Sequence, residues 1–313
     1  MGFFIHKIMR VAIFGANGFI GSHLAEMELD KGNEVVAMIR DFNHKSRHDI
    51  LDKCIIISGD IMFFDLVKRL IADYEIERIY HVAAQSIVKI ANKNPVNCFE
   101  SNIMGTVNIL EAVRQINPKI KTVIASSDKA FGVHETLPYT EDMALKPEDP
   151  YATSKACADL IAQSYHKTYG LNVNIVRCAN VYGADMNLSR IIPNTITRIL
   201  NGQKPQIYSG VLNYKREFIH VLDVCNAYGT VADKGVPGEV YNIGDAECFT
   251  VEEVVKRICR LMDYEGDIEI IGKDFLEIPF QYLSAEKLKS LGWNKQIQLS
   301  EGLSQTIAWY EGN

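Results

Sequence analysis

The stretch at residues 7–21 constrains the fold more than any other part of the chain. An apolar run at 11–14 stops at Gly15, and two further glycines complete the spacing G-x-x-G-x-x-G before a helical pattern begins. A buried strand that turns sharply into a helix needs such glycines for the tight turn, for close approach of the backbone to a pyrophosphate, and for packing of the helix on the strand. The helix N-terminus then offers free N–H groups to phosphate. We therefore expect a dinucleotide-binding turn here, and not a glycine-rich turn without a ligand.

Strand and helix patterns alternate through the first half of the chain. Such alternation is typical of βαβ units in a parallel sheet, with right-handed crossovers and with ligands at the carboxyl ends of the strands. We therefore predict an α/β fold with a Rossmann-type doubly wound parallel sheet. The expected strands lie at 11–14, 34–39, 54–58, 78–83, 121–126 and 172–177, and the expected helices at 19–31, 65–74, 95–117 and 150–169.

The second half of the chain is less regular, and it predicts a smaller C-terminal α/β substrate lobe. Thr250 and Glu253 have the spacing of a capping box at the start of one of its helices. The lobe is expected to close over the carboxyl edge of the sheet and to share residues with it. The expected helices lie at 189–200, 221–232, 250–262, 284–291 and 300–310, and the expected strands at 206–209, 239–243 and 268–271.

Composition excludes several classes of partner. The net charge of −6 argues against nucleic acid or an acidic membrane surface as the main partner. The seven cysteines form no C-x-x-C pair, so we expect no metal site and no disulfide framework, and a reducing cytoplasm as the location. No apolar segment of 18 residues occurs, so no membrane span is expected.

Two groups of residues could carry chemistry. Tyr151 and Lys155 are four residues apart on a predicted helix and therefore share a face. A phenol has a pKa near 10, and a neighbouring ammonium favours the phenolate, which can take a proton from a sugar hydroxyl while a nicotinamide takes the hydride. Ser127, Asp128 and Lys129 follow the predicted strand at 121–126, where catalytic groups gather in this architecture. The alternatives are a surface side-chain pair and a polar turn.

Several motifs occur in a fixed order along the chain. They are Gly15-x-x-Gly18-x-x-Gly21, His81-Val-Ala-Ala-Gln85, Asn102-Ile-Met-Gly-Thr106, Ser126-Ser-Asp-Lys129, Tyr151-x-x-x-Lys155, Arg177-Cys-Ala-Asn-Val-Tyr-Gly183, Arg216-Glu-Phe-Ile-His-Val-Leu-Asp223 and Tyr241-Asn-Ile-Gly244. Together they resemble the extended short-chain dehydrogenase/reductase family, in its nucleotide-sugar epimerase/dehydratase branch. Within that branch the chain is most similar to the CDP-glucose and GDP-mannose 4,6-dehydratases.

The resemblance implies two domains. An NAD(P)-binding domain would cover 1–178, with parts of 215–245 returning to it, and a discontinuous nucleotide-sugar-binding lobe would cover 179–313. The cofactor-binding residues would be Gly15, Asn17, Gly18, Phe19, Ile20, Gly21, Arg40, Asp60, Ile61, Ala83, Ala84, Gln85, Asn102, Tyr151 and Lys155. The substrate-binding residues would be Gln85, Ser127, Asn180, Arg190 and Arg216. The helices at 95–117 and 150–169 would pair with their copies in a homodimer.

The same resemblance bears on the reaction. Epimerases and 4,6-dehydratases both oxidise the C4 hydroxyl of the sugar, but a dehydratase must also remove the C5 proton and expel the C6 hydroxyl, which requires a further acid and base. Asp128 would be that acid, and Lys129 stands where the family usually has a glutamate base. This Asp-Lys form resembles the CDP-glucose 4,6-dehydratases and favours a dehydratase over a 4-epimerase. A keto-sugar reductase and a non-catalytic dinucleotide sensor are further alternatives.

The residues after the second predicted strand bear on the form of the cofactor. Arg40 could accept the 2′-phosphate of NADP, as in the GDP-mannose dehydratases that the chain resembles here. Asp41 could instead bind the ribose 2′-hydroxyl of NAD. The sequence favours NADP+ slightly.

Overall fold

Seven parallel strands form the central sheet, in the order β10-β6-β5-β4-β1-β2-β3. The computed structural model describes residues 8–42, 47–185, 187–245, 247–272 and 278–312. The strands are β1 (Arg10–Phe14), β2 (Glu34–Ile39), β3 (Ile55–Ser58), β4 (Arg78–His81), β5 (Lys121–Ala125), β6 (Val173–Cys178) and β10 (Val240–Ile243). The strand order reverses between β1 and β4, and a ligand crevice is expected at the carboxyl ends of these two strands. The predicted doubly wound parallel sheet is confirmed.

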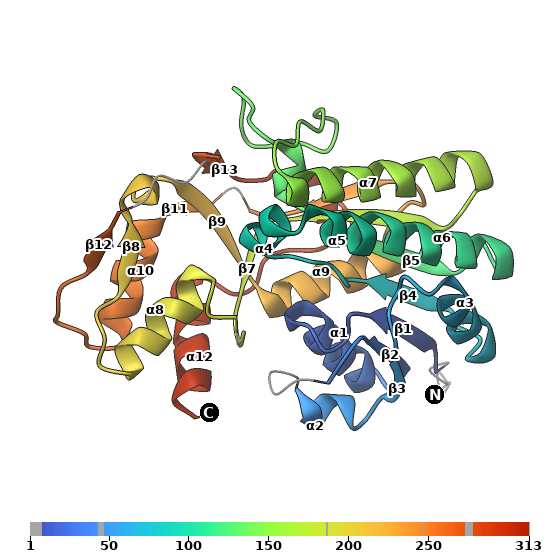
Figure 1. Ribbon diagram of the computed structural model, residues 1–313, viewed down its shortest axis with the longest axis horizontal. Coiled ribbons are helices and arrows are strands. Elements are labelled where there is room, and N and C mark those ends of the chain that lie inside the picture. The colour runs from blue at the N-terminus through green and yellow to red at the C-terminus, as the bar shows by residue number, and fades with distance from the viewer. Residues whose placement is uncertain (1–7, 43–46, 186, 246, 273–277, 313) are drawn as a thin grey trace, which may run out of the picture.

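Helices cover both faces of this sheet (Figure 1). Along β1, Val11 and Ile13 belong to one buried core and Ala12 and Phe14 to the other, because successive side chains of a strand point to opposite faces. The first core is closed by α1 (Phe19–Asp30) and α9 (Val221–Lys234), and the second by α3 (Phe64–Asp73), α6 (Gly105–Ile116) and α7 (Pro150–Tyr169). Burial on both faces explains why the strand sequences are almost continuously apolar.

The long helix expected at 95–117 is interrupted. It consists of α5 (Pro95–Phe99), a π-helical turn η1 (Glu100–Met104) and α6. Two short helices were not predicted, α2 (His48–Leu51) and α4 (Val88–Lys93). A π-helical turn inside a helix is rare and occurs often at functional sites, and here it contains the buried Asn102.

The second lobe surrounds strand β9 (Lys215–His220), which pairs with three short strands: β7 (Asn180–Tyr182), β11 (Cys248–Thr250) and β13 (Phe280–Gln281). A separate pair joins β8 (Gln206–Tyr208) to β12 (Glu269–Ile271). The helices are α8 (Ile191–Leu200), α10 (Val251–Leu261), α11 (Glu286–Lys289) and α12 (Leu299–Glu311). The predicted capping box is confirmed, since Thr250 Oγ1 accepts from the Glu253 N–H and the Glu253 carboxylate accepts from the Thr250 N–H.

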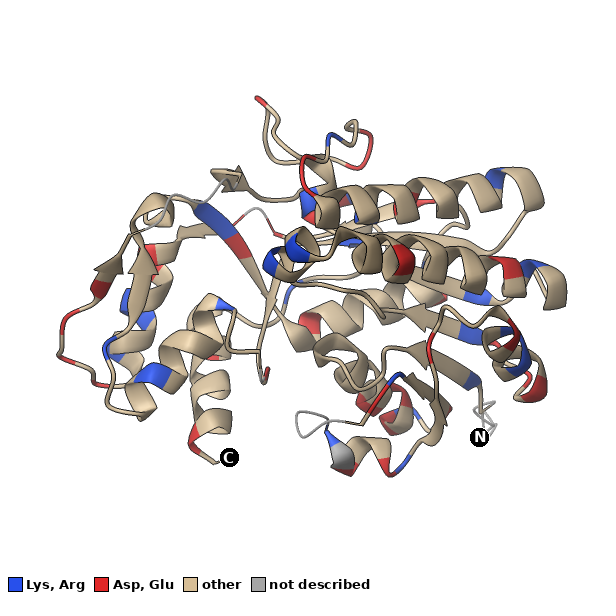
Figure 2. Ribbon diagram, viewed as in Figure 1, with Lys and Arg blue, Asp and Glu red and all other residues tan. Residues whose placement is uncertain are grey.

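Charges are interspersed along the helices and loops of both lobes (Figure 2). Two ion pairs are fully buried in the described ranges: Arg78–Glu28 joins β4 to α1, and Arg177–Asp159 joins β6 to α7. Arg177 Nε lies 2.8 Å from Asp159 Oδ2, and Arg177 Nη1 donates to the Glu141 carbonyl at 3.0 Å. The guanidinium also lies 4.7 Å from the centre of the Phe131 ring. These contacts hold the helix that carries Tyr151 against the sheet.

We predict that Asp159→Ala destabilises the protein by about 3–5 kcal/mol, because it leaves the Arg177 guanidinium buried without its carboxylate. Urea unfolding followed by circular dichroism measures the change. The control is Glu286→Ala, which removes an exposed carboxylate from the Lys289 pair and is expected to change stability much less. Equal stability changes in the two variants would contradict a structural role for the buried pair.

Candidate active site

The glycine turn between β1 and α1 is too tight for any other residue at two positions. Gly15 has φ +90°, and a Cβ there would lie 2.7 Å from the backbone of Ala83. A Cβ on Gly21 would lie 2.1 Å from the Gly15 carbonyl oxygen. The N-cap of α1 is Gly18, so no side chain of its own covers the first N–H groups of the helix. This backbone fits the pyrophosphate of a dinucleotide.

The loops after β2 and β3 lie beside this turn. Asn17 Nδ2 donates to the Asp41 carbonyl at 2.7 Å, which ties the glycine turn to the end of β2. Arg40 is the first residue after β2; its Nε lies 3.7 Å from the Asp41 carboxylate, and both side chains are exposed.

After β3, the Asp60 carboxylate accepts from the Met62 N–H at 3.0 Å. Ile61 is buried, its carbonyl accepts from Asn108 on α6 at 2.9 Å, and its side chain fills the space in which a Cβ on Gly105 would stand. α6 therefore holds Ile61, one of the two cofactor-binding residues expected after β3, in place.

Asn102 organises the loop that follows β4. Its Oδ1 accepts from the Gln85 N–H at 2.8 Å, and its Nδ2 donates to the Gln85 carbonyl at 3.1 Å and to Ser154 Oγ at 2.8 Å. The loop that carries Ala83, Ala84 and Gln85 is therefore bonded to η1 and, through Ser154, to α7. The resemblance implies that Asn102 binds the cofactor, whereas in this structure its carboxamide forms hydrogen bonds with Gln85 and Ser154.

Ser127, Asp128 and Tyr151 meet where β5 ends. Ser127 Oγ donates to Asp128 Oδ1 at 3.0 Å, and the Ser127 hydroxyl lies close enough to the Tyr151 phenol to lower its pKa. Burial raises the pKa of Tyr151 to about 12, although the Ser127 hydroxyl acts in the opposite direction. Burial also raises the pKa of the Asp128 carboxyl, against the lowering effects of Lys129 and Ser127. A buried carboxyl with a raised pKa is suited to donate a proton.

The prediction that Lys155 lowers the pKa of Tyr151 is wrong for the structure described here. An ammonium on the same helix face predicted a lowered phenol pKa, and the pKa is raised because burial dominates. Lys155 Nζ donates instead to the Ala125 carbonyl at 2.8 Å, and burial lowers its own pKa to about 8. Lys155 lies near His81, whose pKa falls to about 3 through burial and then through the Lys155 charge.

The second lobe brings two of its residues to the end of β5. Lys129 Nζ donates to Gln281 Oε1 on β13 at 3.2 Å. Arg216 on β9 is buried, its Nη1 donates to the Pro279 carbonyl at 3.2 Å, and its charge lowers the pKa of Asp128. Sequence reasoning missed Gln281, because a lone glutamine in a short strand belongs to no pattern.

Glu217, next to Arg216, was also missed. It is fully buried, its Oε2 accepts from the Leu283 N–H at 2.9 Å, and its other oxygen accepts from the Asp245 N–H. Burial raises the pKa of this carboxyl well above its usual range. Glu217 thus joins three segments of the second lobe, and its carbonyl accepts from Asn180 Nδ2 at 3.1 Å.

Arg190 lies between the glycine turn and the second lobe. Its guanidinium lies 5.9 Å from the centre of the Phe19 ring at the start of α1, and its Nε lies 3.4 Å from Asp185. Its charge also lowers the pKa of Tyr151. Arg190 is therefore close to both the expected pyrophosphate turn and the phenol.

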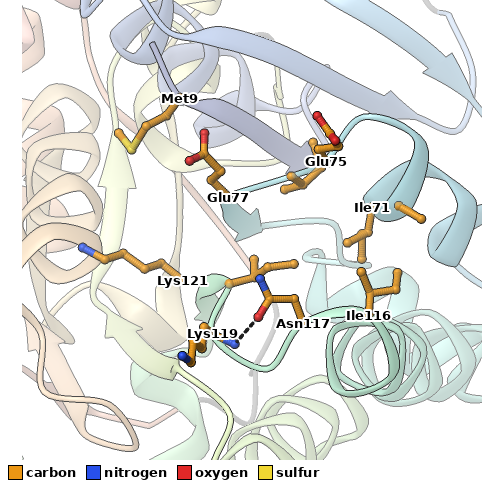
Figure 3. A pocket seen from close by; sticks show the side chains of 11 residues that line it. Met9, Ile71, Glu75, Glu77, Ile116, Asn117, Lys119 and Lys121 are labelled. Atoms are coloured by element: carbon orange, nitrogen blue, oxygen red, sulfur yellow. Dashed lines mark hydrogen bonds between the residues drawn. The ribbon is translucent and has the colours of Figure 1, made fainter. Parts of the chain in front are cut away.

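A separate cavity of about 500 Å³ lies at the opposite edge of the sheet (Figure 3). Met9, Glu77 and Lys121 line it, at the amino ends of β1, β4 and β5. Its position excludes it as the dinucleotide site. Within the described ranges, no group of three potential metal ligands occurs. Over the same ranges, no helix is both long and apolar enough to cross a membrane.

The comparisons with known proteins agree with this geometry. Residues 12–306 match the model of the family described as GDP-mannose 4,6 dehydratase. A trifunctional UDP-glucose 4,6-dehydratase/UDP-4-keto-6-deoxy-D-glucose 3,5-epimerase/UDP-4-keto-L-rhamnose-reductase from Arabidopsis thaliana is 32% identical over 97% of this chain, which spans 47% of that protein's length.

Two solved structures are similar over almost their full length. The dTDP-glucose 4,6-dehydratase of Bacillus anthracis, in complex with NAD, has a TM-score of 0.88 at 32% identity and covers 97% of both chains. The UDP-glucose 4-epimerase of Thermotoga maritima, with UDP-glucose, has a TM-score of 0.91 at 25% identity and covers 97% of this chain and 99% of its own. The chain belongs to the GDP-mannose 4,6-dehydratase family, the nucleotide-sugar dehydratase and epimerase branch of the short-chain dehydrogenases/reductases.

Proposed function

We propose that this chain is a nucleotide-sugar 4,6-dehydratase that converts an NDP-hexose into its 4-keto-6-deoxy product. The observation that carries the proposal is the buried carboxyl of Asp128, hydrogen-bonded to Ser127 beside Tyr151 at the end of β5. C4 oxidation alone needs only the phenol and the serine. A buried acid at the next position is the additional group that elimination of water requires.

The two lobes divide the ligands. In this proposal residues 1–178 hold the dinucleotide, with parts of 215–245, and residues 179–313 hold the nucleotide sugar. The glycine turn, the loop at 83–85 and the residues after β2 and β3 hold the cofactor, while Gln85, Asn180, Arg190 and Arg216 contact the substrate. A guanidinium suits a diphosphate because its planar fork meets two phosphate oxygens. The seven free cysteines fit a reducing cytoplasm.

Oxidation of the sugar begins with a proton transfer. Tyr151 takes the proton of the C4 hydroxyl while Ser127 holds the same oxygen, and Lys155 supplies positive charge on the same helix face. A dinucleotide held by the glycine turn and the loop at 83–85 would supply the acceptor for the C4 hydride and the source from which it returns to the sugar. Since the pKa of Tyr151 is about 12 without ligands, added positive charge must stabilise the phenolate in the complex.

Elimination of water uses the other two residues of this turn. Asp128 donates its proton to the departing C6 hydroxyl. Lys129 is the base that removes the C5 proton, and only its neutral form can do so, because an ammonium has no free electron pair. One N–H of that neutral amine can still donate to Gln281 while its electron pair faces the sugar.

We predict that Asp128→Asn stops water loss and leaves C4 oxidation in place, because an amide cannot donate the proton. Water loss is expected to fall by about 10²–10⁴-fold. A screen of dTDP-, UDP-, GDP- and CDP-hexoses, read by mass, identifies the substrate, and absorbance of the reduced nicotinamide follows oxidation. Asp142→Asn, on the loop before α7, is the control. Formation of the 4-keto-6-deoxy product at the wild-type rate would refute the role of Asp128.

A 4-epimerase is the second candidate, and the similarity to the Thermotoga maritima epimerase supports it. It would return a sugar of unchanged mass from the same screen. A keto-sugar reductase would instead consume free NADPH, and a dinucleotide sensor would give no product.

For the cofactor we propose that Arg40 gives this chain affinity for NADP+, although the solved relatives hold NAD. Arg40 is exposed at the end of β2, where a 2′-phosphate would lie. We predict that Arg40→Ala weakens NADP+ binding by about 10-fold or more and changes NAD+ binding by less than about twofold, because only NADP+ carries the 2′-phosphate that Arg40 would contact. Titration calorimetry measures both. Equal losses for the two cofactors would contradict the proposal.

We further propose a homodimer through α5, η1 and α7. Val96, Met104 and Leu160 on these elements are 62%, 45% and 56% exposed, and such an apolar face suits an interface. We predict a dimeric mass by light scattering and a monomeric mass for Leu160→Glu. Leu200→Glu, at a comparably exposed leucine on α8, is the control and should remain dimeric. A monomeric wild-type protein would contradict the interface.

A further inference from the structure

Gln281 on β13 is fully buried, and only one half of its carboxamide is bonded. Its Oε1 accepts from Lys129 Nζ at 3.2 Å, while Nε2 has no hydrogen-bond partner among the residues that the structure describes. The direction of the amide is fixed, since a lysine nitrogen that donates must meet the oxygen and not the NH₂ group. The two donors of Nε2 therefore lie on the other side of the carboxamide from Lys129.

A buried amide nitrogen without a partner is unfavourable, and such groups in folded proteins call for a specific explanation. An apolar side chain of similar volume would remove this penalty. Gln281 is therefore better explained by a function than by packing.

The surroundings of Gln281 indicate what its donors would meet. Gln281 pairs in register with Arg216 of β9, so the two side chains project from the same face of the small sheet. The charge of Arg216 acts on Asp128, and Lys129 is the next residue. Gln281 thus joins the group of residues that we propose to act on the hexose. Figure 1 shows β9 and β13 at the boundary between the second lobe and the central sheet.

We propose that Gln281 is a substrate-binding residue of the second lobe, whose Nε2 donates to an oxygen of the hexose while Oε1 holds Lys129. The assignment of the ligand as a hexose rests on the proposed function. A hexose offers several hydroxyl acceptors, and the 4-keto form adds a carbonyl. The contact between Lys129 and Gln281 also links the end of β5 to the second lobe, so that sugar binding and placement of the base depend on one side chain.

Two variants separate the two halves of the carboxamide. Gln281→Glu keeps an acceptor for Lys129 and loses the donor, whereas Gln281→Leu loses both. Gln206→Leu, at a glutamine on β8 of the other strand pair, is the matched control. Each variant is first examined for folding by circular dichroism and for its content of bound dinucleotide, which should stay unchanged because the glycine turn is separate from β13.

Binding is then measured by titration calorimetry with dTDP-glucose, UDP-glucose, GDP-mannose and CDP-glucose, each against its own nucleoside diphosphate. We expect Gln281→Glu and Gln281→Leu to bind the best sugar nucleotide of the wild type about 3- to 10-fold more weakly, the effect of one hydrogen bond, and to bind the nucleoside diphosphate within about twofold. Gln281→Leu should also lower kcat, because it releases Lys129 from its contact with the second lobe.

Three results would overturn the inference. Unchanged sugar-nucleotide binding in a folded Gln281→Glu protein excludes the donor, and equal losses for the sugar nucleotide and the nucleoside diphosphate exclude contact with the hexose. If the wild-type protein binds none of the four sugar nucleotides more tightly than the corresponding nucleoside diphosphate, both this inference and the proposed function are overturned. If the wild type binds the sugar and both variants lose it, but no water is lost from the sugar, the dehydratase proposal fails and the role of Gln281 stands.

Discussion

The proposed chemistry depends on ionisable groups that are buried together near the end of β5. Burial shifts the pKa values of three side chains in the direction that favours the neutral form of each: Asp128, Tyr151 and Lys155. For Asp128 and Lys155 this shift brings the pKa closer to neutral pH and reduces the free-energy gap between the two protonation states, whereas for Tyr151 it widens that gap, so the phenolate requires added positive charge in the complex. The main-chain carbonyl of Ala125 and the hydroxyl of Ser127 supply the local hydrogen bonds that make this burial tolerable.

Two different devices keep these groups in place. On the first lobe, the buried Arg177–Asp159 pair fixes α7 to β6, and Asn102 bonds the loop after β4 to the same helix through Ser154. On the second lobe, the buried carboxyl group of Glu217 accepts hydrogen bonds from the backbone of the segments that follow β13 and β10. The contact of Lys129 with Gln281 joins the two lobes at the point where the sugar would react.

Local signals in the sequence were sufficient for the first lobe. The helix expected at 150–169 begins and ends as predicted, since Asp149 caps it, Pro150 occupies its first turn and Gly170 takes the left-handed conformation after it. The parallel strands are buried on both faces and so appear as plain apolar runs. The glycine spacing located the tight turn between β1 and α1, because only backbone without side chains fits there.

Local signals in the sequence could not predict the short strands of the second lobe or the directions of the pKa shifts. Strands such as β7, β11 and β13 are only two or three residues long and are defined by partners far away in the sequence. The π-helical turn at Glu100–Met104 contains Asn102, whose partner Gln85 lies 17 residues away in the sequence. The spacing of Tyr151 and Lys155 predicted proximity, but the direction of a pKa shift depends on burial, which spacing does not contain.

In the proposed reaction, the hydrogen removed from C4 of the hexose returns to the same sugar, at the C6 carbon that loses its hydroxyl. It is tested most directly with an NDP-hexose that carries deuterium at C4 and a mass spectrum that locates the label in the product. The account predicts a 4-keto-6-deoxy sugar that has lost one water and carries the deuterium at C6. Deuterium that leaves on free cofactor, or that returns to C4 without loss of water, would contradict it.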